Sequence, residues 1–177
     1  STVSESFFTL FLGVDIPPEE IPTRGCSHLL FFPDYKGVDR DAYKGPGDLD
    51  IYTRGPIDIN VNSIHDPTLA PEGKSAVVIQ TGASAEFADN WGTKGGKRTK
   101  KYKALKEEVS NRLIATAENV IPGLSKKIEV KFSGTPHTFE RYTLNSGGAS
   151  AGWTFHPQKA MNSGLKFLTG FNPPVKN

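Results

Sequence analysis

Residues 6–15 read SFFTLFLGVD, a nearly continuous run of aromatic and branched side chains. A short apolar run of this kind, bounded by turn-forming residues, is typical of a strand that is buried on both faces. Three prolines at positions 17, 18 and 22 then interrupt the chain. We therefore predict a buried strand at this position, and a turn directly after it.

Five further segments have the pattern of strands. Residues 28–32 form a second apolar run that stops at Pro33, so another buried strand is expected there. Residues 57–62 alternate strictly, as a half-exposed strand does, and residues 76–81 have high β-propensity. Residues 128–132 alternate again, and residues 164–170 form a last short strand. Short turns join 57–62 to 76–81, which makes part of the sheet antiparallel.

One long helix is predicted between residues 99 and 120. Its apolar residues recur at spacings of three, four or seven and so share one stripe: Tyr102, Leu105, Val109, Leu113 and Val120. Pro122-Gly123 ends the helix, because proline cannot continue the backbone ladder. Strands, one long helix and then strands predict an α+β fold with a mixed, largely antiparallel sheet, which we take as one domain over residues 1–177.

Composition narrows the functional classes. The net charge is only +2, so the chain as a whole is not a binder of polyanions. No apolar stretch approaches the roughly 18–20 residues of a membrane span, and residues 7–14 lack the flanks of a signal peptide, so a cytoplasmic setting is expected. The four histidines show no ligand spacing, which predicts no metal site. The single cysteine, Cys26, is expected to be an inert buried thiol.

A basic cluster precedes and enters the predicted helix. Positive charge at a helix N-terminus opposes the macrodipole, so this cluster does not serve helix stability. One interpretation is that the cluster binds phosphates or anionic lipid. The other, which is the ordinary one, is a solvated loop and helix face, whose positive charge Glu107 and Glu108 partly offset. Its members are Lys94, Lys97, Arg98, Lys100, Lys101, Lys103 and Lys106.

Several motifs occur in a characteristic order along nearly the whole chain. Residues 65–74 read HDPTLAPEGK before a strand, residues 121–124 read IPGL after the helix, and residues 135–143 read TPHTFERYT. Gly147-Gly148, Gly152-Trp153 and GLKFLTG at 164–170 follow. This ordered set resembles the phytoene desaturase, carotenoid isomerase and retinol saturase group of FAD-dependent oxidoreductases.

The resemblance implies the substrate-binding domain of an oxidoreductase that uses FAD to move a hydride or to isomerise a polyene. The glycine-rich dinucleotide motif of that family, and the glycine-rich loop after its last strand, are not present in the sequence given. We therefore expect FAD in a parent protein and none on this chain, which by itself would be an inactive fragment. The implied partners are the missing FAD-binding domain and an apolar polyene or isoprenoid-like substrate, with contact at a membrane surface and no nucleic acid. The alternative is a free-standing module whose cluster Lys94–Lys106 binds nucleic acid or anionic membrane.

The resemblance also implies candidate residues that face the substrate or the flavin, although it names no catalytic residue. They are Pro136, Arg141, Tyr142, Gly148, Gly152, Trp153 and Gly170. The glycines would allow close backbone approach, whereas the structural alternative is a turn whose Arg141 pairs with a carboxylate and a Trp153 that lies in the core. Six phenylalanines are candidates for a substrate tunnel, but core positions are the favoured interpretation for most of them: Phe7, Phe8, Phe11, Phe31, Phe32 and Phe132.

Overall fold

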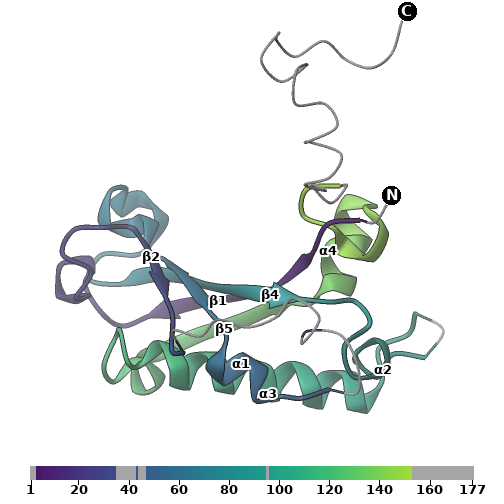
Figure 1. The fold of residues 1–177 in the computed structure, drawn as a ribbon. Helices are drawn as coiled ribbons and strands as arrows, with labels where there is room; N and C mark the ends of the chain where they lie inside the picture. The colour runs from purple at the N-terminus through teal and green to yellow at the C-terminus, as the bar shows by residue number, and fades with distance from the viewer. Residues whose placement is uncertain (1–2, 35–42, 44–46, 95, 153–177) are drawn as a thin grey trace, which may run out of the picture.

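The computed structural model describes residues 3–34, 43, 47–94 and 96–152. In them a five-stranded sheet lies against one long helix, as Figure 1 shows. The strands are β1 (Ser6–Val14), β2 (His28–Phe31), β3 (Ile57–Asn60), β4 (Ser75–Ala83) and β5 (Ile128–Gly134). The helices are α1 (Ile51–Arg54), α2 (Phe87–Trp91), α3 (Lys100–Ala117) and α4 (Pro136–Thr143). Short 3₁₀ turns join them: η1 (Pro18–Glu20), η3 (Asn62–Ile64), η4 (Pro67–Leu69), η5 (Leu124–Lys127) and η6 (Ser146–Gly148).

The sheet has the strand order β2-β3-β4-β1-β5, and each described pair of neighbours is antiparallel. β1 pairs along its whole length with β4, from Ser6 opposite Ala83 to Val14 opposite Ser75. Its other edge pairs with β5, with a register shift between Gly13 and Val14. The predicted α+β fold with a largely antiparallel sheet is confirmed.

The core lies between the sheet and α3, because alternate residues of each strand point to that side. On β1 the core-facing residues run from Phe8 to Val14 in steps of two, and none is more than 4% exposed. Their neighbours Val77 and Ile79 on β4 are fully buried. Removal of this apolar surface from water, at about 25 cal/mol per Å², is the main force that holds the helix on the sheet.

The long helix is confirmed, and Thr99 caps it by accepting a hydrogen bond from the backbone N–H of Tyr102 at 3.1 Å. The helix ends at Ala117, three residues earlier than predicted, and residues 118–120 form a turn before Pro122. The members of the predicted stripe are buried or partly buried against the core: Tyr102, Leu105, Val109, Leu113 and Val120.

The strand over residues 28–31 is present, but the prediction that it is buried is wrong. Among the described strands, β2 lies at the edge of the sheet and pairs with β3 alone. Leu29 and Phe31 pack against the core, whereas Leu30 is 60% exposed and Phe32 is 44% exposed. An edge strand over one end of the core can bury only one of its two faces.

Two further expectations concern single segments. Cys26 is exposed, not buried, because it lies in the turn before the edge strand β2, where its N–H bonds to the carbonyl of Thr23. The strand predicted at residues 164–170 lies outside the described residues. Within the described ranges, no helix combines the length and the apolar character that a membrane span requires.

Candidate functional site

The face of the sheet that points away from α3 is the first candidate surface (Figure 1). Its residues are those that alternate with the core positions, and the register brings them into rows across the strands. One row joins Phe132 of β5, Phe11 of β1 and Val78 of β4. Phe132 is 68% exposed and Phe11 is 45% exposed, so no described element covers the middle of this face. We call this surface the open face.

The apolar part of the open face extends to the next row. There Gly13 of β1 lies between Val130 of β5 and Ala76 of β4. A Cβ atom on Gly13 would lie 3.2 Å from the Cβ of Val130, so the glycine keeps this row shallow. Val130 is itself 47% exposed. The apolar surface therefore spans the three strands β5, β1 and β4.

Polar side chains border this surface in the next row of β1 and β4 and on β2 and β3. The Gln80 amide of β4 donates to the hydroxyl of Thr9 on β1 at 2.9 Å, and Thr9 is only 3% exposed. Asp58 accepts from the Asn60 amide at 2.9 Å and lies 2.7 Å from Nε2 of His28. These contacts pair polar side chains along the border.

The second candidate region is α4, which the sequence pattern left as a turn but which is an eight-residue helix. Thr135 and Thr138 form a capping box, and Pro136 occupies the first helical position. The hydroxyl of Thr135 also bonds to the buried Tyr102 hydroxyl of α3 at 3.0 Å. The start of α4 is thereby fixed against the start of α3.

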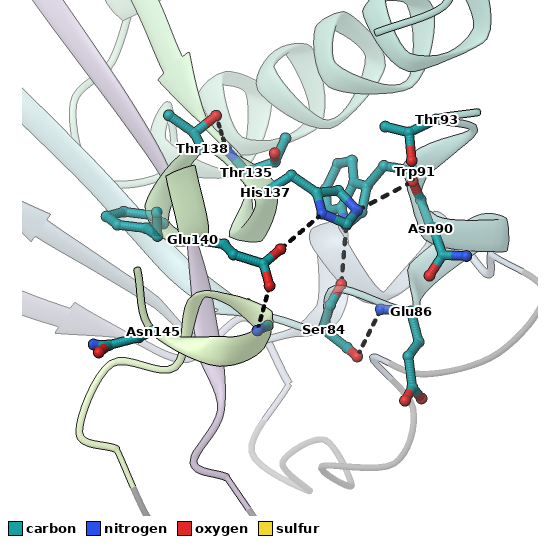
Figure 2. A network of polar contacts seen from close by, with 12 residues as sticks. Ser84, Glu86, Asn90, Trp91, Thr93, Thr135, His137, Thr138, Glu140 and Asn145 are labelled. Carbon is teal, nitrogen blue, oxygen red and sulfur yellow. Dashed lines mark hydrogen bonds and ion pairs between the residues drawn. The ribbon is translucent and has the colours of Figure 1, made fainter. Parts of the chain in front are cut away.

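Figure 2 shows the polar contacts that fix α4 to the turn before α3. Nε2 of His137 donates to the carbonyl oxygen of Asn90 at 3.2 Å, and its Nδ1 lies 3.6 Å from the Glu140 carboxylate. The other oxygen of Glu140 accepts the backbone N–H of Gly147 at 3.0 Å. Glu140 therefore links the imidazole to η6, and His137 links α4 to Asn90.

The carbonyl of Asn90 points outward because residues 88–92 turn with a left-handed backbone. Their φ angles lie between 49° and 67°, a region that costs roughly 1–2 kcal/mol per residue for L-amino acids. Trp91 anchors the turn: it is fully buried, stacks on Phe8 at 5.5 Å between ring centroids, and donates its indole N–H to the Ser84 carbonyl at 2.9 Å. This packing holds the strained backbone in place.

Three of the residues predicted to face the substrate or the flavin lie on α4, and they differ in exposure. Pro136 is buried, whereas Arg141 and Tyr142 project from the last turn of α4 and Tyr142 is 79% exposed. Arg141 forms no ion pair within the described part of the chain, contrary to the alternative that it pairs with a carboxylate. Trp153 and Gly170 lie outside the described residues.

The two predicted glycines have different surroundings. A Cβ atom on Gly148 would lie 2.2 Å from the carbonyl oxygen of Pro136, so Gly148 serves a close approach inside the protein. Among the described residues beyond its chain neighbours, none has an atom within 4 Å of the position that a Cβ on Gly152 would take. Flavin contacts for the residues of 136–152 stay predictions.

The predicted basic cluster lies on the hairpin at residues 94–97 and on the first turns of α3, and its side chains are exposed at Lys94, Lys97, Arg98, Lys100, Lys101 and Lys103. The guanidinium of Arg98 lies 5.7 Å from the centroid of the Tyr102 ring. Lys101 packs its stem over Gly92, where a Cβ would meet it at 2.7 Å. The cluster and α4 therefore lie on the same end of the molecule.

Sequence reasoning missed the contribution of Asn90, His137 and Glu140 to this region. His137 and Asn90 are 47 positions apart, and no periodic pattern connects them. The signal that was present is Thr135-Pro136-His137-Thr138, which has the N-cap threonine and first-turn proline of a helix start. Of the six phenylalanines, only Phe8 is fully buried; Phe7 and Phe31 are partly buried, and Phe11, Phe32 and Phe132 are exposed.

Comparison with known proteins gives one consistent group of relatives. The chain is 31% identical over 147 residues to the chloroplastic prolycopene isomerase of Arabidopsis thaliana, and 30% identical over 146 residues to that of Daucus carota. Prolycopene isomerase 2 of an Oncidium hybrid cultivar is 29% identical over 147 residues. Each match covers 81% of this chain but only 20–21% of the relative, so the chain spans about a fifth of their length. No protein-family model matches the chain.

Proposed function

Because this chain is homologous to the prolycopene isomerases, which are carotenoid isomerases of the phytoene desaturase family, we propose that it is the substrate-binding part of a related oxidoreductase. Its open face holds an extended apolar polyene. The observation that carries this proposal is the row of Phe132, Phe11 and Val78, whose two phenylalanines are exposed, on a sheet whose strands β1, β3 and β4 bury their other face in the core.

The chemistry of a polyene matches this surface. A polyene offers no hydrogen-bonding groups, so its recognition depends on apolar area removed from water. Burying an exposed phenylalanine against such a ligand contributes about 1.5–3 kcal/mol. Gln80 and Asp58, which bond to Thr9 and Asn60, border the apolar surface with polar groups that a polyene cannot hydrogen-bond.

FAD, expected in the whole protein, supplies the redox chemistry when it is bound. The described residues do not fit a flavin-binding site. The Pro136 carbonyl occupies the space beside Gly148. Within the described residues, no glycine-rich turn between a strand and a helix start offers backbone N–H groups to a pyrophosphate. The proposal therefore gives these residues one task, which is to bind and orient the polyene and exclude water from it.

A binding experiment tests the proposal. The 177-residue chain is titrated with prolycopene in detergent, and binding is followed by the shift of the polyene absorption. The double variant Phe11→Gln/Phe132→Gln should bind about tenfold more weakly or worse, because two apolar contacts become polar. The matched control is Leu69→Gln/Leu144→Gln, which changes two exposed apolar residues outside the sheet, 52% and 87% exposed.

The control should bind like the parent chain. Equal weakening in both double variants would show that the polyene only adheres to exposed apolar residues, and the proposal would then be rejected. A parent chain that does not bind prolycopene would reject it as well.

A further inference from the structure

A cleft of about 570 Å³ lies at the end of the molecule where the 93–98 hairpin meets the starts of α3 and α4. It is separate from the open face, and the polyene proposal makes no use of it. Lys97 of the hairpin, Arg98 just before α3 and Arg141 of α4 all line it. Two segments that are distant in the sequence, residues 97–98 and α4, thus bring three cations to one cavity.

These cations are not neutralised by the protein. In residues 3–34, 43, 47–94 and 96–152, none of Lys97, Arg98 and Arg141 forms an ion pair. Glu140 also lines the cleft, but its two carboxylate oxygens are directed to His137 and to the Gly147 N–H. The lining therefore keeps an excess of positive charge.

The start of α3 adds to this positive potential. Its first turn contains no acidic residue and instead carries Lys100, Lys101 and Lys103. A helix N-terminus already bears about half a positive charge from its free N–H groups, so lysines there raise the potential and lower helix stability. An anion bound in the cleft would reduce this electrostatic repulsion at the start of α3, which no acidic residue in its first turn offsets.

The walls of the cleft are held in position before any ligand binds. The Thr99 hydroxyl donates to the carbonyl of Gly92 at 2.5 Å, and His137 donates to the neighbouring carbonyl of Asn90 at 3.2 Å. These bonds join the left-handed turn to α3 on one side and to α4 on the other. A preformed site loses less entropy on binding than a mobile one.

We propose that this cleft binds a phosphate group, with Arg98 and Arg141 as its principal ligands and Lys97 as a third charge. Guanidinium groups form paired hydrogen bonds with phosphate oxygens, and the three cations that line this cavity outnumber its one carboxylate, Glu140. The phosphate is carried either by a free phosphate compound or by the headgroup of an anionic lipid, and the two sources share this chemistry. The inference does not depend on the polyene proposal, and each can fail alone.

The first test is calorimetric titration of the full chain with inorganic pyrophosphate. The variant Arg98→Gln/Arg141→Gln should weaken binding about tenfold or more, since two charge-assisted contacts are lost. The matched control Lys100→Gln/Lys103→Gln removes the same charge from the same end of the molecule but lines no part of the cleft. We expect the control to weaken binding only a fewfold, about as much as a long-range charge effect allows.

Glu140→Gln provides a change of opposite sign. The amide keeps an acceptor for the Gly147 N–H and removes the negative charge from the lining. Pyrophosphate should then bind several-fold more tightly, a gain that partial unfolding of a variant cannot produce.

The second test separates the two phosphate sources. Cosedimentation is measured with phosphatidylcholine vesicles containing one quarter phosphatidic acid, for the parent chain and both double variants. Vesicle binding that Arg98→Gln/Arg141→Gln abolishes assigns the phosphate to a lipid headgroup, whereas binding of pyrophosphate alone assigns it to a soluble compound. Failure to bind either probe, or equal weakening in the two double variants, would overturn the inference.

Discussion

At position 148 the fold requires glycine, because both the backbone angle and the close packing exclude a side chain. The φ of Gly148 is +67°, and a Cβ atom there would lie 2.2 Å from the Pro136 carbonyl oxygen and 3.0 Å from the Ser6 hydroxyl. Gly148→Ala must therefore both strain the backbone and separate η6 from the start of α4. We expect a loss of about 3 kcal/mol or more in the free energy of unfolding, measured by urea denaturation.

Gly152→Ala is the control for that substitution. Gly152 has a similar φ of +75°, but no described residue apart from its chain neighbours has an atom within 4 Å of the position a Cβ would take. Its loss should be about 1–2 kcal/mol, which is the cost of the backbone region alone. Equal losses at the two positions would mean that the contact between Gly148 and Pro136 is not present in solution.

At the scale of elements, the left-handed turn at residues 88–92 should tolerate a substitution by glycine that would destabilise an ordinary helix. Asp89 is exposed and has a φ of 59°. Glycine adopts left-handed φ angles without the steric penalty of a side chain, which stabilises the folded state by about 1–2 kcal/mol. This gain exceeds the entropic cost of fixing a glycine, which is roughly 0.5–1 kcal/mol.

Asp89→Gly should therefore leave the free energy of unfolding unchanged or raise it slightly, as thermal and urea denaturation would report. In an ordinary right-handed helix the same change costs about 1 kcal/mol. A loss of that size would show that the turn is right-handed in solution.

Local patterns predict most elements, but not how they are placed. The stripe from Tyr102 to Val120 gives α3, and the apolar run at residues 6–15 gives β1. The position of β2 at the sheet edge depends on strand order, which no local pattern in residues 28–32 contains, so the apolar run alone predicts a buried Leu30. α4 is too short for its periodicity to be recognised, although its Thr135-Pro136 start was readable.

The functional surfaces were only partly predictable for the same reason. The basic cluster is contiguous in sequence, so its charge was visible, but its meeting with Arg141 of α4 requires the folded chain. Phe11 and Phe132 are opposite each other because of the β1–β5 register, and their exposure depends on which face α3 covers. The motif order did predict the relationship to the carotenoid isomerases.

At the scale of the whole molecule, acid should destabilise the fold partly through Glu118. Ser125 donates both its N–H and its hydroxyl to the Glu118 carboxylate, at 3.0 and 2.5 Å, which joins the end of α3 to η5. These hydrogen bonds lower the pKa of Glu118 below its ordinary 4.5. A lowered pKa in the folded state means stability that is present above pH 4.5 and is lost as the pH falls through the folded value.

The prediction is tested by measuring the urea midpoint of unfolding of the parent chain and of Glu118→Gln at several pH values from neutral to about pH 3. The glutamine has no charge to lose, so its midpoint should fall less over that range. Asp66, whose pKa Thr68 lowers by the same kind of hydrogen bond, gives part of the remaining acid dependence. If the urea midpoints of the two proteins fell equally with pH, Glu118 would not contribute to the acid sensitivity.

The central claim is that the two faces of one sheet have different tasks, with one packed on α3 and the other open to an apolar ligand. Methyl NMR of the full chain with added prolycopene tests it most directly, because valines alternate between the faces. Val78 and Val130 lie on the open face, whereas Val77 and Val14 lie in the core. The account predicts that polyene shifts the signals of Val78 and Val130 and leaves those of Val77 and Val14 in place; shifts of the core valines alone, or none at saturation, would contradict it.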